Sequence, residues 1–244
     1  LAFGLYRRYL FIQKTKQIIE KERNRSDELL LNILPKETAN ELKLNGKVAA
    51  KKFKSVTVLF SDFKSFTQYA EQLSPELLVE RVDYYFSQFD QIMEKYGLEK
   101  IKTIGDAYMC AGGLPFPGHD HAVKMVLAAL EMAQFVKEVK KENPNNQFEV
   151  RIGIHTGPVV AGVVGTKKFA YDIWGDTVNI AARMESSSEP GKINISESTY
   201  QLIKDTFECE FRGEIEAKNR GMMKMYYVTA RKESASTSQA IHRL

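Results

Sequence analysis

The order of hydrophobic patterns after residue 52 is the feature that most constrains how this chain can fold. Strand-type alternation of apolar residues begins at Phe53 and ends at Asp62. Apolar residues at helical spacing then run from Pro75 to Gly97, residue types that favour a helix start and a helix stop. The following patterns predict a strand, a second strand, a long helix and a final pair of strands at residues 98–104, 107–111, 121–141, 148–155 and 159–164.

This order, β-α-β-β-α-β, predicts an α+β fold with a ferredoxin-like sheet and helices on one of its faces. Further α and β elements follow, including a helix over Thr177–Ser186 with Ile180, Ala181 and Met184 turned inward. The chain has 244 residues, of which 43% are hydrophobic, so it can bury a sizeable core.

A helical segment precedes this sheet. Leu1–Ile12 is apolar and aromatic but carries Arg7 and Arg8, and it is too short to span a bilayer. It is either a helix that packs on a core or the cytoplasmic end of a truncated membrane helix, with the arginines on the positive inner side. We expect a cytoplasmic domain of a membrane-anchored protein, and no intact span or cleavable signal peptide is visible.

The next residues favour a helix with weak coiled-coil character. Ile12, Ile19, Ser26 and Ile33 recur at heptad spacing, but other seam positions are charged. A marginally paired helix and a solvated linker helix both fit this pattern. Pro35 ends the segment, and one short helix fits between it and Gly46.

Charge is distributed unevenly along the chain. Residues 1–54 hold 13 basic and 6 acidic residues, whereas residues 55–244 hold 22 basic and 25 acidic residues. The acidic body argues against a nucleic-acid-binding face. The two cysteines, Cys110 and Cys209, are too few for a disulfide framework, and we expect two buried thiols in a reducing compartment.

Two aspartates stand where chemistry could occur. Asp62 follows an apolar strand, and Asp106 occupies the predicted hairpin. If these strands are neighbours, the two carboxylates could hold a pair of Mg²⁺ ions for displacement at phosphorus. Alternatively, Asp106 serves the turn and Asp62 caps the next helix. Walker, dinucleotide, HExxH and calcium-loop patterns are absent from the sequence.

Four collinear segments carry a family resemblance. The runs FSDFKSFT, KIKTIGDAYM, RIGIHTGPVVAGVVG and YDIWGDTVNIAARM, at residues 60–67, 100–109, 151–165 and 171–184, closely resemble signature segments of class III nucleotidyl cyclases. The resemblance runs from about Phe53 to Val228. It implies a cyclase domain over residues 47–231. The weak heptad pattern makes residues 1–46 a signalling helix and linker, and the Ser-, Thr- and Lys-rich composition of residues 232–244 predicts a disordered tail.

The resemblance implies a metal site and a set of phosphate-binding cations. Asp62 and Asp106 match the aspartates that hold two Mg²⁺ ions, with Mn²⁺ as a substitute and the backbone carbonyl of Phe63 as a further ligand. Arg183 matches the arginine that stabilises the transition state, and Asn179 the asparagine that orients the ribose. Lys218 matches the lysine that holds the phosphates, in a loop where Asn219 departs from the usual pattern, and Lys167 matches a basic position near the triphosphate.

The resemblance also implies which base is bound. Lys102 and Asp172 match the pair in adenylyl cyclases that donates to adenine N1 and accepts from its 6-amino group. Guanine presents the opposite polarity at those atoms, so ATP is favoured over GTP.

The family site is shared between two catalytic domains, and this sequence carries both residue sets, which predicts a homodimer with an upstream sensor or membrane domain. The main hypothesis is an adenylyl cyclase that converts ATP to cyclic AMP and pyrophosphate. The alternatives are a guanylyl cyclase and a silent nucleotide-binding regulatory domain. His119-Asp120-His121 is assigned to helix capping and His155 to turn structure.

Overall fold

The computed structural model describes residues 2–142, 148–165, 167–217 and 221–232. These residues divide into two compact units. The first comprises described residues within 1–50 and 162–172, and the second those within 51–161 and 173–244. The expected tail beyond Lys232 lies outside the described residues.

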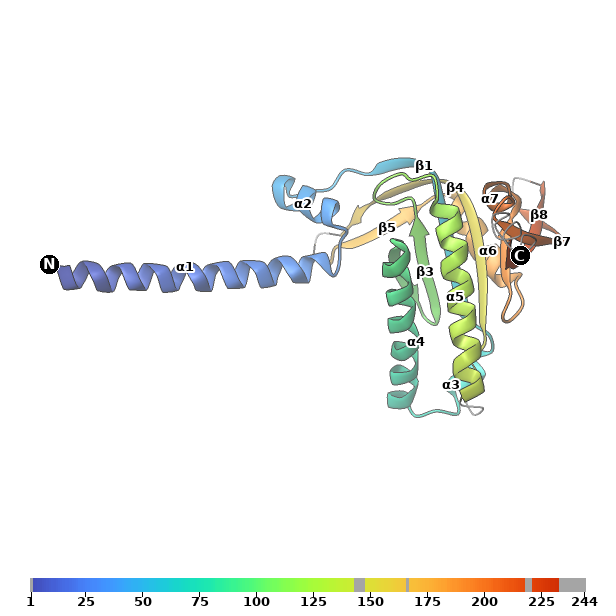
Figure 1. Cartoon of the computed structure of the whole chain (residues 1–244), viewed down its shortest axis with the longest axis horizontal. Helices are drawn as coiled ribbons and strands as arrows, with labels where there is room; N and C mark the ends of the chain where they lie inside the picture. The colour runs from blue at the N-terminus through green and yellow to red at the C-terminus, as the bar shows by residue number, and fades with distance from the viewer. Residues whose placement is uncertain (1, 143–147, 166, 218–220, 233–244) are drawn as a thin grey trace, which may run out of the picture. The chain divides into compact units, whose positions relative to one another are not determined.

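The first unit holds two helices before the sheet. Helix α1 spans Ala2–Leu31 as one continuous helix (Figure 1), and α2 spans Lys36–Asn45, as the positions of Pro35 and Gly46 predict. Gly46 ends α2 in the left-handed conformation, with φ of 66°, which glycine adopts without steric cost. An ion pair of 2.7 Å joins Lys43 on α2 to Asp27 on α1.

The apolar residues at the start of α1 are exposed. Phe3, Tyr6 and Phe11 have 73%, 60% and 70% of their surface exposed. Within the first compact unit, these side chains therefore pack on no core. Among the helices described here, none combines the length and the apolar character that a membrane crossing requires.

The second unit is built on a mixed sheet in the order β2-β3-β1-β4-β6-β8-β7. All neighbours in this order are antiparallel except β4 and β6. The order of its first four strands is that of the predicted ferredoxin-like sheet. The bounds are β1 Lys51–Phe63, β2 Glu99–Ile104, β3 Ala107–Gly112, β4 Val150–Val164, β6 Ile193–Ser196, β7 Phe207–Ala217 and β8 Gly221–Arg231. A further strand, β5 Ala170–Trp174, pairs with β4.

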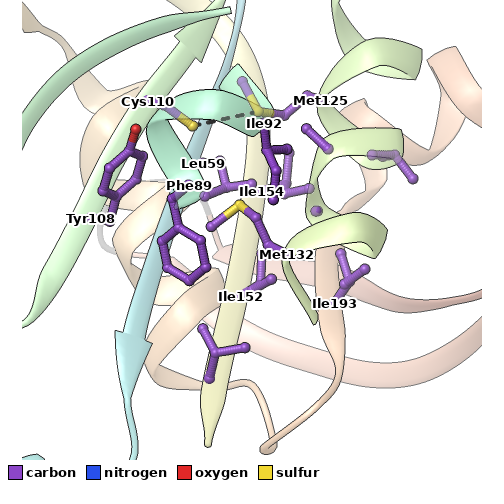
Figure 2. Packing of buried hydrophobic residues seen from close by; sticks show 14 of the residues in the cluster. Leu59, Phe89, Ile92, Tyr108, Cys110, Met125, Met132, Ile152, Ile154 and Ile193 are labelled. Carbon is purple, nitrogen blue, oxygen red and sulfur yellow. Dashed lines mark hydrogen bonds between the residues drawn. The ribbon is translucent and has the colours of Figure 1, made fainter. Parts of the chain in front are cut away.

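Two long helices cover one face of this sheet. They are α4, Pro75–Tyr96, and α5, His121–Glu142, both at the predicted positions. Figure 2 shows the core between α5 and the strands, where Leu59, Ile152 and Ile154 pack with Met125 and Met132. The short helices α3, Phe66–Ala70, and α7, Glu197–Ile203, complete the unit.

Helix α6, Asp176–Ser186, is one of the further elements expected after the ferredoxin-like part, and it lies on the opposite face of the sheet. The side chains of Ile152 and Ile154 belong to the core with α5. Gly153 between them must face the other way, because successive strand residues alternate, and it lies against the backbone of Glu185 at the end of α6. Strand β1 is therefore covered on both sides, and its residues from Val56 to Ser61 are all buried.

The predicted strand pair at residues 148–164 is wrong. A single strand, β4, runs through Thr156, Gly157 and Pro158. Proline lacks a backbone N–H, so it interrupts a ladder rather than forming part of it. Strand β1, which pairs with β4, accommodates the missing hydrogen bond by a register shift between Phe53 and Val56, opposite Pro158.

Both cysteines are free thiols, as predicted, but they differ in burial. Cys110 is fully buried, and its Sγ lies 3.7 Å from the Met125 Sδ (Figure 2), whereas Cys209 is half-buried. Burial raises the pKa of both thiols, more strongly for Cys110.

Candidate active site

The fold brings Asp62 and Asp106 together. Asp62 stands near the end of β1, and Asp106 lies in the turn between β2 and β3, after Gly105 with φ of 61°. Strands β1 and β3 are antiparallel neighbours with Ser61 opposite Tyr108, so the condition set by the sequence is met. The two carboxyl groups lie within hydrogen-bonding reach of each other.

The electrostatics of this pair disfavour a negative charge on Asp106. Burial, and then the hydrogen bond and charge of Asp62, raise the pKa of Asp106 to about 7. Hydrogen bonds from backbone groups, including Phe63, oppose this rise. Two carboxylates so close cannot both ionise without a cost, which a bound cation would remove.

The donor set fits Mg²⁺. Within the described ranges, no group of three or more His, Cys, Asp or Glu side chains is placed to hold a metal ion. The expected donors, two carboxylates and the Phe63 backbone carbonyl, would therefore form an incomplete shell. Mg²⁺ typically keeps several waters and binds through one or two carboxylates together with substrate phosphates, so an incomplete shell is what such a site needs.

Two charged residues at this site were not assigned from the sequence. Arg151 faces Asp62 across the β1–β4 ladder, and its Nη2 donates to Asp62 Oδ2 at 2.7 Å. The same nitrogen lies 3.1 Å from Glu185 Oε1. Burial raises the pKa of Glu185 to about 7, and Arg151 opposes this while Asp62 and Asp106 add to it. The sequence did offer one indication that Arg151 has a role, because it is the one charged residue within the apolar strand segment 150–154.

Helix α6 carries the two other residues expected at the catalytic step. Ile180, Ala181 and Met184 are buried, as predicted, and fix the inner side of the helix. Asn179 and Arg183 are one turn apart and therefore share a side of it. The Arg183 Nη1 donates to the carbonyl oxygen of Glu216 on β7 at 2.9 Å.

The residues expected to bind the base and the phosphates are placed on three segments. Lys102 lies on β2 opposite Met109, and Asp172 lies on β5 in the other compact unit. Lys167 is exposed between β4 and β5. Lys218 and the neighbouring Asn219 lie outside the described residues.

The structural alternatives can be judged at three places. Asp62 binds Arg151 rather than the start of α3, where Ser65 occupies the capping position. His121 begins α5 and turns inward, and its Nδ1 lies 2.7 Å from the Thr57 hydroxyl. His155 lies within β4 rather than at a turn, buried, with its Nδ1 2.7 Å from the Ser196 hydroxyl.

Comparison with known proteins agrees with this arrangement. The model of the adenylate and guanylate cyclase catalytic domain family matches residues 48–230. An adenylate cyclase of Mycobacterium tuberculosis is 39% identical over 227 residues, which cover 93% of this chain and 51% of that protein. A guanylate cyclase soluble subunit beta-2 of Rattus norvegicus is 41% identical over 208 residues, 85% of this chain and 30% of that protein.

A solved structure shows the same fold. The guanylate cyclase domain of RhGC from Catenaria anguillulae, in complex with GTP, superposes with a TM-score of 0.70 at 39% identity, covering 75% of this chain and 100% of that one. The chain spans about half the length of the mycobacterial relative and less than half the length of the rat relative. The family match extends over most of the chain, so the chain belongs to the class III adenylate and guanylate cyclase catalytic domain family.

Proposed function

We propose that this chain is an adenylyl cyclase that converts ATP to 3′,5′-cyclic AMP and pyrophosphate. The observation that carries the proposal is the pair Asp62 and Asp106 on neighbouring strands, with the pKa of Asp106 raised to about 7. Such a pair has the negative charge that attracts divalent cations, and bound cations would in turn attract a nucleoside triphosphate.

The metal site would be held by the two carboxylates and the Phe63 carbonyl. Two bound Mg²⁺ or Mn²⁺ ions would lower the pKa of the ribose 3′-hydroxyl and neutralise the triphosphate. Asp62 and Asp106 keep their orientation because β1 is paired on both sides and the β2–β3 turn is short. Asn179 on α6 would orient the ribose for in-line attack on the α-phosphate.

The charge on the departing pyrophosphate requires fixed cations. We assign Arg183 to the transition state and Lys167 and Lys218 to the phosphates. The hydrogen bond from Arg183 to the Glu216 carbonyl does not neutralise the guanidinium, because a carbonyl oxygen carries no formal charge. That guanidinium is therefore suited to stabilise a developing negative charge.

Lys102 and Asp172 would select adenine. A lysine donates at adenine N1 and an aspartate accepts from the 6-amino group. Guanine instead has a donor at N1 and an acceptor at position 6. An enzyme that buries such groups rejects the base that leaves them unpaired.

A homodimer would complete two equivalent sites. Asp62 and Asp106 of one subunit would act with Lys102, Asp172, Asn179 and Arg183 of the other. The presence of both sets in one chain supports this arrangement, because a two-fold axis then generates two complete sites. A signal from an upstream domain would act through α1 on how the subunits are oriented.

The test is product formation from ATP and from GTP, with Mg²⁺ or Mn²⁺, separated by chromatography. Wild type should form cyclic AMP, and Lys102→Glu should lose it or shift toward GTP. Lys52→Glu is the matched control, since it makes the same charge change on an exposed residue of β1 and should leave the product unchanged. Equal use of both nucleotides by wild type and Lys102→Glu would contradict the base assignment.

A guanylyl cyclase is the second candidate. It is favoured by relatives such as the soluble beta-2 subunit, whose identity to this chain is as high as that of the mycobacterial adenylate cyclase. Formation of cyclic GMP alone would establish it. Nucleotide binding with no cyclic product under any condition would instead indicate a regulatory domain.

A further inference from the structure

The guanidinium of Arg151 is shared between two carboxylates. Its Nη2 lies 2.7 Å from Asp62 Oδ2 and 3.1 Å from Glu185 Oε1. The three side chains are 24%, 23% and 11% exposed, so water screens these interactions only in part. The Arg151 guanidinium therefore contacts both Asp62, a predicted metal ligand, and Glu185, a carboxylate with no assigned role.

The sharing is unequal. The contact with Asp62 is a hydrogen bond, whereas the contact with Glu185 is an ion pair without hydrogen-bond geometry. Glu185 Oε1 and Arg151 Nε are both buried and lack a hydrogen-bond partner among the described residues. Buried polar atoms without partners are costly. A shift of the guanidinium from Asp62 toward Glu185 would bring these two atoms closer to satisfying each other.

A divalent cation on Asp62 would force such a shift. The guanidinium occupies Oδ2 of Asp62, and two cations at the same oxygen repel each other strongly in a half-buried site. Arg151 must then move, and a buried arginine needs another acceptor nearby.

Glu185 is placed to be that acceptor. The end of α6 packs so closely on β4 that a side chain at Gly153 would overlap the Glu185 backbone. Gly153 is two residues from Arg151 on the same face of β4, so the acceptor is held at a constant position relative to the arginine.

We propose that Glu185 is a positioning residue that takes up the Arg151 guanidinium when a divalent cation binds Asp62. The arginine then stays beside the metal site instead of competing for it. This inference rests on the metal assignment in the proposed function.

The experiment measures Mn²⁺ binding without nucleotide, from the electron paramagnetic resonance signal of free Mn²⁺. Glu185→Gln keeps the shape of the side chain and removes its charge. It should bind Mn²⁺ roughly tenfold more weakly than wild type, because Arg151 then remains on Asp62. Arg151→Gln should bind at least as tightly as wild type, since the competing cation is gone.

The double variant separates this role from a simple charge effect. Adding Glu185→Gln to Arg151→Gln should weaken Mn²⁺ binding no further, because Glu185 would act only through the arginine. Equal weakening in both backgrounds would show that Glu185 acts by its own charge, and would overturn the proposal. An unchanged affinity in Glu185→Gln alone would overturn it too.

Two further variants complete the design. Glu185→Asp keeps the charge but shortens the side chain, so it should also weaken Mn²⁺ binding, and wild-type affinity there would contradict the proposal. Asp106→Asn tests the underlying metal site. If it binds Mn²⁺ as wild type does, the metal assignment fails. If it loses binding while Glu185→Gln is unaffected, only the role of Glu185 fails.

Discussion

Gly153 on β4 lies against the backbone of Glu185 at the end of α6, so closely that a Cβ atom at residue 153 would overlap main-chain atoms. This contact sets the distance between α6 and the sheet. It joins the strand that carries Arg151 to the helix that carries Asn179 and Arg183.

Gly153→Ala should therefore destabilise the domain by about 3 kcal/mol, because backbone cannot move aside as a flexible side chain can. Chemical denaturation followed by circular dichroism measures this. Gly118→Ala is the matched control, since a Cβ there would meet only Asp120 Oδ1 at an ordinary 3.5 Å. Equal stability of the two variants would show that α6 is not packed on β4 as described.

Asp106→Asn should abolish the effect of metal on stability. At pH 8 in the presence of a chelator, an Asp106 with a pKa near 7 is ionised beside Asp62, so the neutral amide should raise the melting temperature by a few degrees. Mn²⁺ should stabilise wild type and leave the variant unchanged, because only the native pair binds the ion. Thermal melts with and without Mn²⁺ test this, and equal Mn²⁺ stabilisation of both proteins would contradict it.

His121 should make stability fall in mild acid. Burial lowers the pKa of His121 below its ordinary 6.5, so the unfolded chain binds more protons than the folded one in that range. Its contribution is present above about pH 6.5 and is lost as the pH falls through the unfolded and then the folded pKa. Unfolding free energies between pH 7.5 and 5 should decline less steeply in His121→Gln. The slope is the readout, because the variant also loses the Thr57 contact.

Arg183→Ala and Asp106→Ala should each lose most cyclase activity, by roughly 10² to 10³-fold. If the subunits share their sites, an equal mixture of the two variants should regain about a quarter of wild-type activity. Half of the dimers are then mixed, and each mixed dimer has one intact site. The mixture is assayed after co-expression. Activity no higher than that of either variant alone would argue that each chain supplies its own complete site.

The sequence by itself determined the order and bounds of the main elements and where two aspartates stand along them. Local rules were sufficient there: Pro75 and Gly97 delimit α4, and Gly105 forms the turn before Asp106. The resemblance of four segments then indicated the family, which the comparisons confirmed.

Only the tertiary structure decided what lies against those elements. It made residues 150–164 one strand, since β1 could absorb Pro158 by a register shift that no local pattern reveals. It also brought Arg151 and Glu185, 34 positions apart in the numbering, to within 3.1 Å. Charges so far apart in sequence meet only when a strand and a helix pack together, because their interaction depends on distance in space and on the exclusion of water.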